Sequence, residues 1–170
     1  ENALVTEYEK LLASAKIDFH NETLNLSEMQ KYTISPDRAV RKEAWTKIAG
    51  FFTGNSKRLD EIYDELVKNR TEQAHKLGYK NYVQLGYDRL GRNCYGPDEV
   101  KKYREQIVRD LVPMISELKK RQAKRLGLPD IKFWDDGCLF PDGNPTPKGN
   151  TRELVAQAKK MYHGMSPLTG

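Results

Sequence analysis

The amino-acid sequence predicts a mainly α-helical protein that carries one small β-hairpin. Apolar residues recur at spacings of three and four along most of the 170-residue chain, which is the period of a helix with one buried face. Capping residues precede these stretches and glycines follow them, as expected at helix ends. Sustained alternation of apolar and polar residues is confined to residues 17–26. The length fits one domain, or one lobe of a larger protein.

The N-terminal part predicts a helix followed by the hairpin. Between Leu4 and Lys16 one side of the helix is apolar, with Leu4, Tyr8, Leu11 and Leu12. Ile17 to Phe19 and Thr23 to Leu26 then alternate, and the turn-like residues His20 to Glu22 separate them. An isolated hairpin is marginally stable in water, so we expect it to pack on helices.

The next stretch predicts two long helices. Ser35 is expected to cap the first, with Pro36 at the first helical position and Asp37 near the positive end of the helix dipole. Two glycines weaken this helix, so we expect a break or bend between Thr53 and Ser56. The helical spacing then resumes and stops at Gly78, a residue suited to a C-terminal cap.

The second half predicts a short helix, a long kinked helix and a final helix. The short helix covers Asn81 to Leu90. A new helix starts at Gly96, and Pro113 should kink it because proline cannot donate its backbone hydrogen bond. Residues 130–149 are rich in proline and glycine and predict a long irregular loop, which usually has a function or a partner surface. The final helix is expected to begin with a capping box formed by Asn150 and Glu153.

Composition excludes several classes of protein. The net charge is +5, but the basic residues are interleaved with acids, so they favour a solvated surface over a nucleic-acid site. The densest basic run, Lys119 to Arg125, is explained by the negative end of the helix dipole. Cys94 and Cys138 are too few for a disulfide framework and indicate free thiols in a reducing cytoplasm. The sequence has no membrane-spanning apolar run and no signal peptide.

The sequence offers no complete catalytic or metal-binding set. Glu72 and His75 form an E-x-x-H pair, which resembles half of a di-iron site, but no second pair exists, so surface roles are favoured. Acidic residues at positions 60–65 lie near basic residues and predict a salt-bridged face. Cys94 and Ser35 lack a recognisable base. We therefore predict no catalytic residue and no metal ligand in this chain.

The turn from Gly91 to Tyr95 has two interpretations. Arg92 and Tyr95 leave a helix end in a glycine-bounded loop, where they could grip a peptide backbone or a carboxylate. Alternatively, Tyr79, Tyr82 and Tyr87 pack the helix junction and Arg92 caps carbonyl groups. Sequence alone leaves both interpretations open.

Five strings in order resemble the oligoendopeptidase F family, zinc metallo-oligopeptidases of the thimet oligopeptidase-like group. They are KLLASAKIDF with LNLSEM, SPDRAVRKEAW, LDEIYDELVKNRTEQAHKLGYKNYVQLGYDRLGRNCY, VPMISELKKRQAKRLGL and FPDGNPTPKG. None is as specific as a zinc motif, but together they cover most of the chain.

The resemblance implies that residues 1–170 are the N-terminal, non-catalytic helical lobe of a larger helical metallopeptidase. The missing C-terminal catalytic half would carry H-E-x-x-H and a downstream Glu, and would bind one Zn²⁺ through two His and one Glu. Without that motif, this chain is expected to be inactive alone. The family resemblance implies a channel that admits oligopeptides, and we expect Arg92, Tyr95 and Asn144 to face it.

Two other interpretations remain at this point. The chain could be a self-contained helical interaction module that binds a protein or nucleic acid, or a relative that has lost the enzyme. A lobe of a larger enzyme predicts an exposed apolar face where the missing half packs. A self-contained module predicts a closed apolar core.

Overall fold

The computed structural model describes residues 1–166 and is mostly helical, with one antiparallel hairpin. The last four residues of the predicted 1–170 lobe lie outside the described part. In chain order the elements are α1 (Asn2–Ala13), β1 (Ile17–Phe19), β2 (Glu22–Leu24), α2 (Gln30–Thr33), α3 (Arg38–Gly54), α4 (Ser56–Lys76), α5 (Tyr82–Arg89), α6 (Pro97–Gln106), the π-helical turn η1 (Ile107–Leu111), α7 (Val112–Arg125), the 3₁₀ turn η2 (Phe133–Asp135) and α8 (Thr151–Met165).

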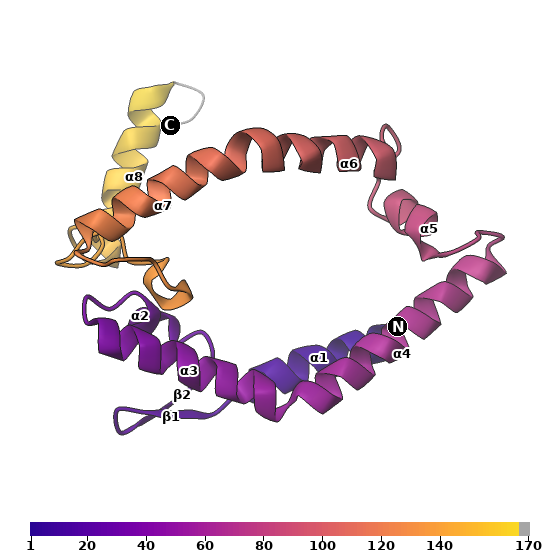
Figure 1. The fold of residues 1–170 in the computed structure, drawn as a ribbon, viewed down its shortest axis with the longest axis horizontal. Coiled ribbons are helices and arrows are strands. Elements are labelled where there is room, and N and C mark those ends of the chain that lie inside the picture. The colour runs from indigo at the N-terminus through magenta and orange to yellow at the C-terminus, as the bar shows by residue number, and fades with distance from the viewer. Residues whose placement is uncertain (167–170) are drawn as a thin grey trace.

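The helices are arranged as an open ring with two arms (Figure 1). Helices α3 and α4 form the first arm, and α6, η1 and α7 form the second arm, opposite the first. Helix α5 lies between the arms at one end of the ring, while the loop after α7 meets α3 at the other end. Helix α8 extends away from the ring beside α7 in this view. The ring therefore depends on contacts at its two ends.

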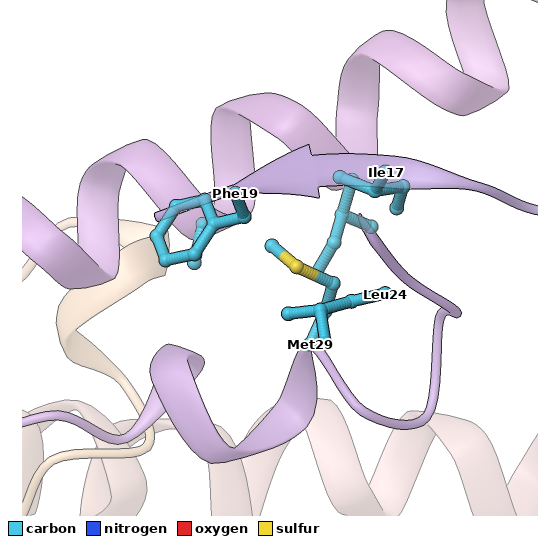
Figure 2. Close-up of a cluster of buried hydrophobic side chains, with 6 residues drawn as sticks. Ile17, Phe19, Leu24 and Met29 are labelled. Atoms are coloured by element: carbon cyan, nitrogen blue, oxygen red, sulfur yellow. The ribbon is translucent and has the colours of Figure 1, made fainter. Parts of the chain in front are cut away.

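The hydrophobic core lies between the hairpin and α3, at one end of the α3–α4 arm. Ile17, Phe19 and Leu24 of the hairpin pack with Met29 before α2 (Figure 2). Ala44 and Ile48 of α3 complete this cluster. The hairpin thus packs on a helix, as its marginal stability alone requires. Its turn has two residues, His20 and Asn21, at φ of 49° and 65°, so it is one residue shorter than predicted.

The long helices begin and end close to the expected positions. A break separates α3 from α4 at Asn55, and Gly78 follows α4 with φ of 82°. The predicted cap Ser35 is wrong, because α3 begins at Arg38 and Asp37 is its capping residue. The Asp37 carboxylate accepts backbone hydrogen bonds from Ala39 and Val40 at 2.8 and 3.4 Å. Ser35 instead accepts a hydrogen bond from the backbone N–H of Asp37.

Proline in the second arm produces a local change of helix type. Pro113 lies in the first turn of α7, directly after the π-helical turn η1. A proline ring displaces the carbonyl four residues earlier and cannot donate to it, and the wider turn accommodates this loss. The expected disturbance at Pro113 is therefore present. The capping box at Asn150 and Glu153 is also confirmed, with reciprocal bonds of 2.8 and 3.1 Å.

The second arm has little burial of its own. From Pro97 to Arg125 only Gln122 and Ala123 are buried. Seven large apolar side chains of this arm are 41–65% exposed, namely Tyr103, Val108, Leu111, Val112, Met114, Ile115 and Leu118. In residues 1–166 no helix is both long enough and apolar enough to cross a lipid bilayer.

Candidate functional site

Two arginines of α3 converge on one buried carboxylate in the loop after α7. Arg38 donates from Nε and Nη2 to the two oxygens of Asp135, both at 2.9 Å. Arg41 donates from Nη2 to Oδ1 of the same residue at 3.0 Å. The Asp135 side chain is fully buried and that of Arg41 is 3% exposed. This cluster joins segments that are more than 90 residues apart in the sequence.

Arg41 and Asp135 have further hydrogen-bond partners in the backbone. Arg41 donates from Nη1 to the carbonyls of Ser35 and Pro36, at 2.7 and 2.9 Å. Its Nε donates to the carbonyl of Trp134 at 3.3 Å, and the backbone N–H of Lys132 donates to Asp135 at 3.1 Å. A buried ion pair is tolerated when such additional bonds offset the loss of water.

Burial raises the pKa of Asp135, but the opposing hydrogen bonds from Arg38 and Arg41 are stronger together and bring the pKa to about 2. The carboxylate is therefore charged at neutral pH, as the two guanidinium groups require. Its role is to hold the loop against α3.

Helix α7 holds the same loop from the other side. Gln122 donates from Nε2 to the carbonyls of Asp136 and Cys138, at 3.1 and 2.7 Å. Arg125 donates from Nε to the carbonyl of Leu139 at 2.7 Å, and its guanidinium lies over the ring of Phe140. Together these bonds link α3 to α7 through the loop and close the ring at this end.

An apolar groove of about 1430 Å³ lies between the two arms beside this closure. We call it the interarm groove. One wall comes from α2 and α3, the other from η1 and α7, and residues 128–137 of the loop form its end. Its apolar lining includes Ile34, Trp45, Ile107, Leu111, Val112, Ile115, Leu128, Ile131 and Phe133. Trp45 and Phe133 pack edge to face, with ring centroids 5.8 Å apart.

Few polar groups of the groove are free. The hydroxyl of Thr33 donates to the carbonyl of Gln30, and that of Ser116 to the carbonyl of Val112, both at 2.8 Å. Lys119 pairs with Asp136. The groove therefore presents mainly apolar side chains, with charged side chains of α7 and the loop among its lining.

Arg92 and Tyr95 lie together in the connection from α5 to α6. This connection is at the end of the ring opposite the loop after α7 (Figure 1). The Arg92 guanidinium lies 5.6 Å from the Tyr87 ring centroid, and Tyr95 meets the same ring edge to face at 6.4 Å. Both side chains are exposed, and no carboxylate in residues 1–166 pairs with Arg92. Tyr87 thus packs the junction, while the Arg92 charge faces outward.

Asn144 lies in the loop after α7 and does not join Arg92 and Tyr95. Its Nδ2 donates to the carbonyl of Gly137, and its Oδ1 accepts from the backbone N–H of Leu139, both at 2.7 Å. The two bonds fold the loop back on itself. The three residues predicted to bind substrate therefore do not form one site.

The residues weighed as metal ligands have other partners. Glu72 pairs with Lys76 at 2.7 Å, which lowers the pKa of the carboxyl, and His75 Nε2 lies 3.1 Å from the carbonyl of Lys80. No group of three or more potential metal-ligating side chains occurs in the described part of the chain. Glu72 and His75 are both exposed, as expected for surface residues.

The charged runs are mostly paired within the chain. Glu61 and Glu65 of α4 meet Arg58, which also pairs with Glu7 of α1. In the basic run of α7, Lys120 and Arg121 pair with Glu117. The expected salt-bridged face of α4 is confirmed, and in the α7 run two carboxylates, Glu117 and Asp136, meet three of the five basic residues.

A second charge cluster ties α1, α4 and α5 together. Glu1 accepts from Arg70 at 3.0 Å and from Arg89 at 2.9 Å. The hydrogen bond from Arg89 is the main reason that the pKa of Glu1 falls to about 2. Arg89 also donates to the hydroxyl of Tyr82 at 2.9 Å. This cluster fixes α5 at the second end of the ring.

The comparisons with known proteins agree on one family. The family model described as peptidase family M3 matches residues 31–137. No curated protein matches the chain. A solved structure described as PZ peptidase A with inhibitor 2 is 46% identical, with a TM-score of 0.95 over 99% of this chain. The predicted resemblance is thus confirmed at the level of the family.

Two further solved structures are assigned as oligoendopeptidase F. One is 46% identical with a TM-score of 0.94, and the other, from Bacillus anthracis str. Ames, is 44% identical with a TM-score of 0.90. Both matches cover 99% of this chain. This chain in turn covers 30% of the first two relatives and 31% of the third, so it spans about a third of their length or less.

Replacing Asp135 with Asn removes the counter-charge of two arginines, one of them buried. We expect the free energy of unfolding to fall by about 3–5 kcal/mol, measured by urea denaturation. The control Asp142→Asn, exposed in the same loop, should change it by less than about 0.5 kcal/mol. Equal values for the two variants would contradict the role of Asp135.

The lowered pKa of Asp135 predicts a loss of stability in acid. Its folded pKa of about 2 lies below the value of about 3.9 for an unfolded chain, so the unfolded state binds more protons between these pH values. The resulting stabilisation, about 3 kcal/mol, is complete above the unfolded pKa and is lost as the pH falls through the folded pKa. Urea midpoints of the wild type and Asp135→Asn should therefore converge between about pH 5 and about pH 2. A constant difference over that range would contradict the assignment.

Proposed function

Because the chain belongs to peptidase family M3, we propose that it is a non-catalytic part of a zinc metalloendopeptidase that hydrolyses oligopeptides. The proposal rests on the identity of 44–46% to PZ peptidase A and oligoendopeptidase F over nearly the whole chain. The segment lies on the N-terminal side of the catalytic segment. That catalytic segment carries the zinc ligands, and no catalytic step is assigned to residues 1–166.

In this proposal the segment forms one wall of a channel for oligopeptides. The exposed apolar side chains along α6, η1 and α7 support it, because a self-contained module would bury them in its own core. The pairing of three of the five basic residues in the α7 run with carboxylates also disfavours a nucleic-acid site. A lobe that packs against a larger catalytic half accounts for both observations.

We assign Arg92 and Tyr95 to the channel side of this wall. Arg92 stands over Tyr87 without a carboxylate partner among the described residues, so its guanidinium can pair with a peptide carboxylate or carbonyl. Tyr95 adds an exposed ring beside it. The oxygen and the nitrogen of the Asn144 side-chain amide are both already bonded within its loop, so we propose that Asn144 shapes the channel side of that loop.

We further propose that the intact protein works in the cytoplasm. Cys94 and Cys138 are both free thiols, one exposed and one buried, which suits a reducing compartment.

The first experiment determines the coding sequence beyond residue 170 and assays the intact protein for peptidase activity. We expect an H-E-x-x-H motif after residue 170, and hydrolysis of quenched-fluorescent oligopeptides that a chelator abolishes and Zn²⁺ restores. The purified 170-residue chain should give no hydrolysis. An open frame without the motif, or an intact protein that is inactive with Zn²⁺, would refute the proposal.

The same assay tests Arg92. Arg92→Ala should raise KM about ten-fold for peptides with a charged terminus, because a hydrogen bond to a charged group is lost. Lys102→Ala, which removes an exposed positive charge on α6, is the matched control and should leave KM unchanged. An unchanged KM for Arg92→Ala would remove this residue from the substrate path.

A further inference from the structure

We propose that the interarm groove binds an amphipathic α-helix from the remainder of the same polypeptide. The edge of this helix that faces α7 carries acidic residues. The inference rests on the proposed function only in requiring that the polypeptide continues. It goes further by naming the surface, the kind of segment and the charge of that segment.

The first step concerns the amount of exposed apolar surface. Ile34, Leu111, Val112 and Ile115 line the groove and are 41–46% exposed, while Phe133 is 60% exposed. The exposure continues beyond the groove along the second arm, at Val108 and Leu118. Folded proteins rarely leave such a continuous apolar surface in water unless another segment covers it.

The second step concerns the kind of segment. An extended peptide would need hydrogen-bonding partners in the groove for its backbone N–H and C=O groups. The hydroxyl groups of Thr33 and Ser116 are already bonded to carbonyls of their own helices. A helix satisfies its backbone within itself and inserts only side chains. The apolar walls from α3 and α7 therefore fit the recognition mode in which the apolar face of a helix enters a groove.

The third step concerns charge. Four lysines and two aspartates line the groove. Lys119 and Lys132 pair with the two aspartates, and Lys120 pairs with Glu117. No carboxylate in the described residues pairs with Lys124. An incoming helix with an acidic edge beside α7 would complement the remaining positive charge.

The fourth step identifies the source of the helix. The relatives keep the same arrangement of this segment, with TM-scores of 0.94 and 0.95, although most of each relative's chain lies outside the match. The open arrangement of the arms is thus compatible with a much longer polypeptide. The rest of the polypeptide is also tethered to this segment, so its effective concentration exceeds that of a second copy.

The test is photo-crosslinking of the intact protein with p-benzoylphenylalanine in place of Ser116. We expect one intramolecular crosslink, located by mass spectrometry in a helical segment after residue 170 that combines apolar residues with Asp or Glu. The same probe in place of Tyr63, which is 69% exposed on α4 and does not line the groove, is the control and should not reach that segment. A crosslink to a second copy, to an added oligopeptide or to no segment overturns the inference.

Thermal unfolding of the intact protein gives a second readout. Ile115→Asp should lower Tm by several degrees, since a carboxylate would enter the covered groove. Val67→Asp, a helix position on α4 that does not line the groove and is similarly exposed in this segment, should change Tm by less. Equal shifts would contradict the inference. A frame that lacks H-E-x-x-H refutes the proposed function, whereas a crosslink elsewhere in an active peptidase refutes only the helix in the groove.

Discussion

The structure depends on the buried carboxylate of Asp135 and the two arginines that hold it. Arg38 and Arg41 belong to the first arm, and the loop that carries Asp135 is bonded to the second arm through Gln122. Between Pro97 and Arg125 the second arm buries only Gln122 and Ala123. These polar bonds therefore hold the arm in place, a role that a hydrophobic core has in most proteins. Buried charges in such a position favour one geometry over alternatives, since any displacement leaves a charge without its partner.

The two ends of the ring are built differently from its middle. A charge cluster around Asp135 links the two arms at one end, while at the other end Glu1 with Arg70 and Arg89 holds α5 against α4 and α1. Between them the arms expose apolar side chains and enclose the interarm groove. This combination suits a segment that presents a preformed surface to a larger partner.

Local features could be predicted from the sequence because short-range rules determine them. The break before α4, the glycine after it and the capping box at Asn150 all follow from neighbouring residues. The ion pair of Arg41 with Asp135 could not be predicted, because the two residues are 94 positions apart and no local sequence pattern indicates a contact over that separation. An aspartate directly after Phe133 and Trp134 was the available signal, since a carboxylate in an aromatic stretch is buried only when it is paired. The bonds of Asn144 within its own loop could not be predicted either, because they depend on how residues 137–144 fold back on themselves.

The most direct test of this account measures the distance between the two arms. Spin labels at positions 68 on α4 and 102 on α6, in a chain with Cys94 and Cys138 replaced by serine and alanine, report that distance by electron–electron double resonance. The account predicts a narrow distribution in the parent chain and in Asp142→Asn, and a broad one in Asp135→Asn, because only the last variant opens the ring. A distribution that stays narrow in Asp135→Asn would show that the arms are held by something other than this buried carboxylate.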